Sequence, residues 1–185
     1  MVIEINTKVS IGEQYGNNPP NIVLEDAKFY GRPNFIGEMD RFNDDRRKFT
    51  VLIPNDIADQ LRAFGYNVKT DIPSKQDMEE KGYEEISHLK VFLNFTIPMD
   101  KRGRADELDY ETGPDVFIRQ NDEVEKLNSR TVGILDRSRF ETMDMEIRAW
   151  EYNKEEHPGQ YSARLVQFVG TMRPSILDAK YGRLR

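Results

Sequence analysis

Residues 88–95 read His88-Leu89-Lys90-Val91-Phe92-Leu93-Asn94-Phe95, and this stretch decides the expected fold. Side chains along a strand point alternately to the two faces of a sheet. The odd-numbered residues here are all apolar and suit a core. The even-numbered face places Phe92 beside Lys90. We therefore expect a half-buried strand that shows water an aromatic ring next to a cation.

The same alternation recurs along the chain and predicts a β-rich domain. Phe49, Val51 and Ile53 alternate with polar residues, and longer strands are expected near 143–153 and 161–172. A helix is expected from Asn55 to Gly65, with a turn or short helix near 132–138. Many short strands with one or two short helices favour an all-β fold, here an OB-like Greek-key barrel with long loop additions.

Domain boundaries are expected at the two ends of this pattern. Residues 1–20 end in a run of Gly, Asn and Pro and are interpreted as a flexible leader. Residues 21–173 would form the barrel, and 174–185 a C-terminal tail that ends in basic residues.

Composition limits the function classes. The net charge is −6, so general attraction to nucleic acid is not expected and any contact needs locally concentrated charge. The chain has no cysteine, which excludes disulfides, thiolate metal sites and cysteine nucleophiles. The N-terminus shows no signal-peptide pattern and no apolar run is long enough to span a bilayer. We expect a cytoplasmic protein with no membrane partner.

Aromatic and cationic residues interleave in residues 28–53 of this acidic chain. Rings can stack on unpaired bases while nearby cations contact phosphates. Phe35 and Phe42, in a loop too long for a tight hairpin, could equally plug the end of the barrel. The interpretation favoured is a surface for single-stranded nucleic acid. Its candidate residues in this stretch are Tyr30, Arg32, Phe35, Phe42, Arg46, Arg47 and Lys48.

Two further strands are expected to carry outward rings. If Met143, Met145 and Ile147 face inward, then Arg148, Trp150 and Tyr152 on the same strand face outward. On the first strand, Val23, Ala27 and Phe29 are expected inside. Exposed rings indicate either a partner or a covering loop, and base stacking is preferred for Phe92 and Trp150 together. The remaining candidates for nucleic-acid binding are Lys90, Phe92, Arg148, Trp150 and Tyr152.

Other chemistry is less well supported. Asp136, Glu141, Asp144 and Glu146 could form a metal-dependent nuclease site, but such acids are usually salt-bridged surface. His88 and His157 suggest neither a zinc site nor a base, and no phosphate-binding glycine loop is present. We expect no catalytic residue, metal or cofactor. Lys101-Arg102-Gly103-Arg104 is a second phosphate-binding candidate.

The order of motifs resembles single-stranded DNA-binding proteins encoded by tailed bacteriophages. The likeness covers about residues 21–173. Its motifs are Asn21–Ala27, Arg32–Phe35, Phe42-Asn43, Arg47–Phe49, Tyr66–Lys69, Leu89–Phe95, Val132–Asp136, Asp144–Ile147 and Ala163–Leu165.

The resemblance implies an OB-like barrel that coats unpaired DNA during phage replication or recombination, without sequence preference or cofactor. Its implied partners are single-stranded DNA and phage or host replication and recombination proteins, and a homodimer is left open. The basic C-terminus departs from the acidic tail of many such proteins, which puts recruitment by the tail in doubt. The alternatives are a phage structural or protein-interaction module without DNA binding and, less favoured, the nuclease.

Overall fold

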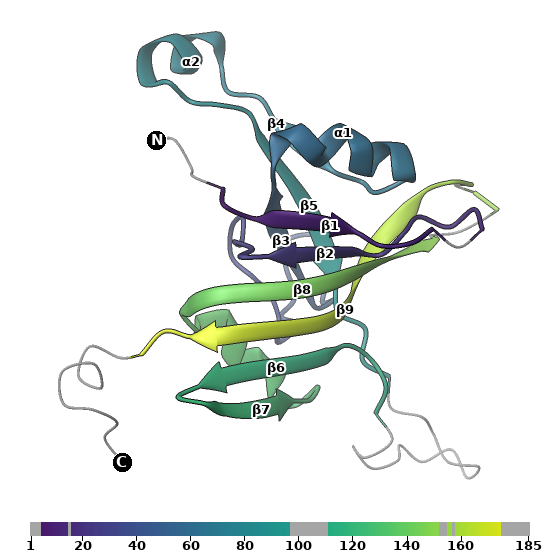
Figure 1. Ribbon diagram of the computed structural model, residues 1–185, viewed down its shortest axis with the longest axis vertical. Coiled ribbons are helices and arrows are strands. Elements are labelled where there is room, and N and C mark those ends of the chain that lie inside the picture. Colours follow the sequence, from purple (N-terminus) through teal and green to yellow (C-terminus); the bar gives the residue numbers. More distant parts are fainter. Residues whose placement is uncertain (1–4, 15, 97–110, 152–154, 157, 175–185) are drawn as a thin grey trace.

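The computed structural model describes residues 5–14, 16–96, 111–151, 155–156 and 158–174. In these residues nine strands form one sheet (Figure 1). The strands are β1 (Lys8–Ile11), β2 (Ile22–Glu25), β3 (Lys48–Ile53), β4 (Lys69–Asp71), β5 (Ile86–Phe92), β6 (Asp115–Gln120), β7 (Glu123–Leu127), β8 (Phe140–Glu151) and β9 (Tyr161–Met172). The helical elements are α1 (Asn55–Phe64), α2 (Lys75–Lys81) and the 3₁₀ helix η2 (Val132–Arg137).

The sheet curls back on itself as a Greek-key barrel. Its main order is β1-β2-β8-β9-β5-β3, with β5 and β9 parallel. The chain that follows β2 then reaches β3: the Tyr30 N–H donates to the Thr50 carbonyl at 2.8 Å, and the Leu52 N–H to the Lys28 carbonyl at 2.9 Å. These bonds join the chain after β2 to β3, so that β2, β8, β9, β5 and β3 form the five strands of an OB-like barrel, with β1 added beside β2. The predicted fold class is confirmed.

Five phenylalanines form the centre of the barrel core. Phe35, Phe49 and Phe168 are buried, and the rings of Phe29 and Phe140 pack against them. The Phe35 and Phe49 centroids lie 5.3 Å apart in a stacked pair, while Phe168 meets Phe35 edge-on at 5.9 Å. The alternation predicted for β3 and β5 holds, because Phe49, Val51 and Val91 all face this core.

Helix α1 has the predicted limits. Ala58 and Leu61 form its buried stripe, and Gly65 ends it with a left-handed φ of 109°. Helix α2 was not expected and stands away from the sheet beyond β4 (Figure 1). Neither α-helix in the described part of the chain has the length and apolar character needed to cross a bilayer.

Two expectations near the N-terminus need correction. The stretch interpreted as a leader contributes β1, which pairs with β2 from Lys8 opposite Glu25 to Ile11 opposite Ile22. On β2 itself, Ile22 and Leu24 are buried while Val23 is only half-buried, so the predicted inward face is wrong there. The reason is Asp26, whose left-handed φ of 54° interrupts the alternation before Ala27.

Candidate nucleic-acid interface

The outer face of the barrel carries a row of four side chains across four strands. Lys48 on β3 pairs in register with Phe92 on β5, and Phe92 pairs with Arg164 on β9. Arg164 in turn pairs with Arg148 on β8. Directly opposed residues on neighbouring strands project from the same face. Their inward neighbours, such as Val91 and Ala163, are buried, so the row faces outward.

A groove of about 840 Å³ runs along part of this face. It is lined from β3, β5 and the start of β9, and from the ends of the neighbouring loops and α1. Its aromatic lining consists of Tyr30, Tyr66, His88, Phe92 and Tyr161. Its cationic lining consists of Arg46, Arg62, Lys69 and Lys90. Rings and cations therefore share one concave surface, as contacts with bases and phosphates require.

Trp150 lies beside this groove, one row from Arg164. It pairs in register with Ser162, which lines the groove, and 45% of its surface is exposed. The guanidinium of Arg164 lies over the Trp150 ring at 4.2 Å from the centroid, and that of Arg148 at 5.7 Å. Arg164 contacts Trp150 and is also the register partner of Phe92, so the three side chains form one continuous outward surface.

Tyr30 and His88 form a rigid pair farther along the groove. Their rings stack with centroids 4.6 Å apart and 22° between the planes. The Tyr30 hydroxyl donates to Asp71 at 2.5 Å, and His88 Nε2 lies 3.2 Å from the other Asp71 oxygen. The backbone of Tyr30 is also fixed to Thr50. Because three contacts hold Tyr30, its ring is oriented before any ligand arrives.

Burial and neighbouring cations together lower the pKa of two cations on this face. Burial, and then the charges of Lys48 and Lys69, lowers the pKa of Lys90. Burial and the charge of Arg148 likewise lower the pKa of Arg164. Such neighbours repel, and a bound anion would relieve the repulsion.

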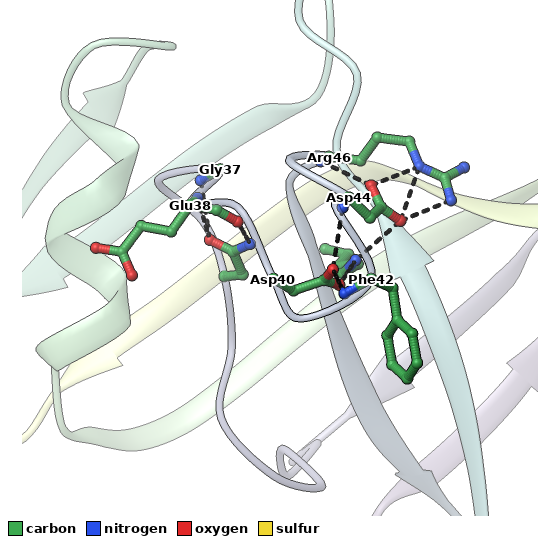
Figure 2. A network of polar contacts seen from close by, with 8 residues as sticks. Gly37, Glu38, Asp40, Phe42, Asp44 and Arg46 are labelled. Atoms are coloured by element: carbon green, nitrogen blue, oxygen red, sulfur yellow. Dashed lines mark hydrogen bonds and ion pairs between the residues drawn. The ribbon is translucent and has the colours of Figure 1, made fainter.

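Two acidic residues hold the cations at the start of β3 (Figure 2). Arg46 donates to Asp44 through Nε at 3.0 Å and Nη2 at 2.8 Å. Lys48 Nζ lies 2.8 Å from Asp40 and 3.0 Å from Asp44. Arg46 also covers the Phe92 ring at 4.5 Å from its centroid. Arg46 and Lys48 therefore already have anionic partners within the protein.

Arg47 was predicted to contact nucleic acid like Arg46 and Lys48, but it does not lie with them. Strand alternation turns it to the other face, where its guanidinium lies 5.3 Å from the centroid of the Phe95 ring. Burial lowers its pKa, although Glu111 and Asp136 oppose that shift. Its contacts point to a role in the barrel wall.

Phe35 is also corrected as a candidate for base contact. Its side chain has no exposed surface, so a base cannot reach it, and the end-plug interpretation holds instead. The loop is fixed there because the Phe35 and Ile36 N–H groups donate to the two Asp136 oxygens at 2.6 and 3.0 Å. A loop has no side-chain period, so alternation could not decide which of its rings is buried.

The other predicted residues lie apart from the groove. Phe42 is 74% exposed, and its ring points away from the acidic network, with Arg41 at 4.7 Å from its centroid (Figure 2). Arg32 lines a separate hollow of about 420 Å³ together with Asp136. Tyr152 and Lys101–Arg104 lie outside the described residues.

Sequence reasoning missed Arg164, His88 and Tyr161 as members of this surface. Alternation around the buried Ala163 and Leu165 would have placed Arg164 outward. Alternation places His88 on the same face as Lys90 and Phe92, but its chemistry was considered only as that of a metal ligand or base. The position of Tyr161 depends on the close packing of its ring against Gly65, a contact between distant segments that has no local signal.

Three of the four acids considered for a nuclease site have structural partners. Asp136 accepts two backbone N–H groups, and Asp144 accepts the Asp26 N–H at 3.0 Å. Glu146 accepts from the Asn21 amide at 3.4 Å. In the described ranges, no three or more metal-ligating side chains gather into a possible metal site.

The fold and this face together define a class. In an OB barrel, the face of the second and third strands and the adjoining loops bind oligonucleotides or oligosaccharides. Here the second and third barrel strands are β3 and β5. The loop between the first two barrel strands, β2 and β3, carries Arg46 near its end. Rings and cations on that face distinguish a barrel for nucleic acid.

The chain belongs to a family of phage single-stranded DNA-binding domains. Residues 13–184 match the family model described as "Putative phage ssDNA-binding domain". A search of curated proteins finds no match. Among solved structures, the single-stranded DNA-binding protein from bacteriophage Enc34 in complex with ssDNA is similar, with 13% identity and a TM-score of 0.46 over 89% of this chain and 96% of that one. Another structure of the Enc34 protein gives 14% identity and a TM-score of 0.44, covering 96% of both chains.

Proposed function

We propose that the protein binds single-stranded DNA without sequence preference along the outer face of β3, β5, β9 and β8. The observation that carries this proposal is that Phe92 and Trp150 lie on one outward face with Arg164 between them. In this proposal the protein coats unpaired DNA in phage replication or recombination, and acts without catalysis or a cofactor.

The rings would receive bases and the cations would contact phosphates. Phe92, Trp150 and Tyr30 offer flat surfaces, and each stacked base would contribute roughly 1–3 kcal/mol. Arg164 and Lys90 are cations crowded by other cations, so a phosphate between them would remove repulsion. Every base has a π-face, so stacking of this kind selects unpaired strands without selecting a sequence.

The test is to compare single-stranded and duplex binding in two matched variants. Arg164→Ala removes the cation between the rings. Arg119→Ala removes an exposed arginine from β6, whose register partner Thr171 lies near the other end of β9. Anisotropy of labelled oligo-dT should show about tenfold weaker binding for Arg164→Ala, because a charge-assisted contact is worth about 1.5–3 kcal/mol. Arg119→Ala should bind like the unchanged protein.

Two results would contradict the proposal. Equal weakening by both variants would mean that net charge, not this face, attracts DNA. Duplex binding as tight as single-strand binding would mean that the rings play no part.

A further inference from the structure

We propose that Asp40 and Asp44 are specificity-determining residues that bias the groove against duplex DNA. Their ion pairs cancel the charge of Lys48 and Arg46, so that a phosphate backbone alone finds little free charge at this edge. A strand gains there only if it also brings an unpaired base to Phe92. This inference rests on the proposed function and adds a residue role to it.

The negative and positive charges in these ion pairs are equal in number. Two carboxylates face two cations, and Asp44 contacts both cations while Asp40 contacts Lys48. The backbone holds the carboxylates in place: the Phe42 and Asp44 N–H groups donate to Asp40 Oδ1 at 2.8 and 3.0 Å (Figure 2). The Arg46 N–H donates to Asp44 Oδ1 at 2.9 Å. The pairs are therefore built into the loop and are not chance surface contacts.

These pairs border the ring that is proposed to receive a base. Lys48 is the register partner of Phe92, and the Arg46 guanidinium lies over the ring while bonded to Asp44. An incoming base must share or replace this stacked guanidinium. An incoming phosphate must compete with Asp44 for the same N–H groups.

The ion pairs persist at neutral pH. A hydrogen bond from Arg46 is the main cause that holds the pKa of Asp44 well below its usual range, and one from Lys48 lowers the pKa of Asp40. Burial opposes the charge of Lys48, but its hydrogen bonds to Asp40 and Asp44 outweigh burial and raise its pKa. Both carboxylates are thus charged wherever the protein would meet DNA.

Duplex and single strand respond differently to such internal competition. A duplex offers phosphates but keeps its bases paired and stacked, so replacing a carboxylate by a phosphate exchanges one ion pair for another. A single strand can instead place a base at Phe92 beside the Arg46 guanidinium, and this contact leaves the ion pairs with Asp44 and Asp40 in place. The carboxylates therefore penalise the duplex, which can approach this edge only through phosphates, more than the single strand, which can approach it through a base.

The test is the double variant Asp40→Asn/Asp44→Asn, compared with Asp77→Asn/Asp115→Asn. Asparagine keeps the oxygen that accepts the backbone N–H groups and removes the charge. The control variant changes the net charge by the same amount, because it also replaces two aspartates. Asp77 and Asp115 likewise form ion pairs, with Lys81 and Lys126, but these lie away from the groove. Affinities for oligo-dT and for a duplex of equal length are measured at one salt concentration, with unfolding curves for each variant.

The expected result is a change of preference as well as of affinity. Duplex binding of Asp40→Asn/Asp44→Asn should tighten about tenfold and single-strand binding about threefold or less, because the duplex depends on phosphate contacts with the freed cations while the single strand already has its base contact. The control pair should change both affinities equally. Equal tightening in the double variant, or no change, would overturn the inference while leaving single-strand binding intact. No binding of oligo-dT by the unchanged protein would instead overturn the proposed function. If the double variant is unfolded, Asp44→Asn alone gives the same comparison.

Discussion

At the scale of single residues, Phe92 is the side chain on which the proposed interface depends most. It projects outward between Lys48 and Arg164 while its neighbours Val91 and Leu93 are buried. Replacement by leucine keeps apolar bulk but removes the flat ring. Because a base stacked on a ring is worth roughly 1–3 kcal/mol, Phe92→Leu should weaken oligo-dT binding about tenfold.

The matched control for this change is Phe117→Leu on β6. Phe117 is also a half-buried aromatic residue next to β9, but it pairs with Val169, away from the groove. Binding measured by anisotropy should be unchanged in Phe117→Leu. A similar loss in both variants would show that aromatic content of the sheet matters, and not the position of Phe92.

Phe35 and Phe42 lie in one loop, yet they should respond in opposite ways to removal of the ring. Phe35 is fully buried against Phe49 and Phe168, so Phe35→Ala should lower the free energy of unfolding by about 3–5 kcal/mol. Phe42 is exposed, and Phe42→Ala should stay within about 0.5 kcal/mol of the unchanged protein. Urea denaturation measures both. Similar values for the two variants would contradict the assignment of Phe35 to the core.

Residue-level prediction succeeded where a strand period exists. Alternation placed Phe92 and Trp150 outward correctly because both lie in strands with a clear buried face. The same alternation places Arg46 and Lys48 on the face opposite Phe49, which implies that Arg47 faces away from them, but all three cations were predicted to contact nucleic acid. The contacts of Asp44 with Lys48 and Arg46 depend on a turn that composition alone does not define.

At the scale of elements, the end of α1 is coupled to the groove through Gly65. A Cβ there would lie 2.7 Å from the ring of Tyr161, and the residue has a φ of 109°. Gly65→Ala should therefore destabilise the protein both by backbone strain, about 1–2 kcal/mol, and by displacing a ring that lines the groove.

Gly82→Ala at the end of α2 provides the comparison. Gly82 has a φ of 66°, and a Cβ there would meet nothing within 4 Å, so only the strain applies. Thermal unfolding should show a larger loss for Gly65→Ala than for Gly82→Ala, and only the former should weaken oligo-dT binding. Equal losses with unchanged binding would contradict the link between α1 and the groove.

Elements with a buried face could be predicted, and those without one could not. The helix limits of α1 and the strands β5, β6, β8 and β9 follow from apolar periodicity. Helix α2 has no buried residue, and β7 buries only Leu127, so neither shows the pattern on which prediction depends. Strand β1 is short and half-exposed, and its pairing with β2 is a long-range choice.

At the scale of the whole molecule, an acidic protein presents a cationic groove because charge is distributed by strand register. The net charge is −6, yet Lys90, Arg148 and Arg164 gather on the outer face of neighbouring strands. The negative net charge disfavours general binding of polyanions, while the clustered cations leave one surface that attracts phosphates. Binding should consequently depend on salt, with a log–log slope of about −3 if about four phosphates are contacted.

The most direct measurement uses Trp150, the chain's only tryptophan, as the reporter of its own site. Oligo-dT is added to the protein at low salt while Trp150 emission is followed, and salt is then raised. Stacking of a base on the ring predicts saturable quenching that reverses as salt releases the strand. Oligo-dT binding that is evident by anisotropy but leaves Trp150 emission unchanged would place the DNA elsewhere and contradict the proposed interface.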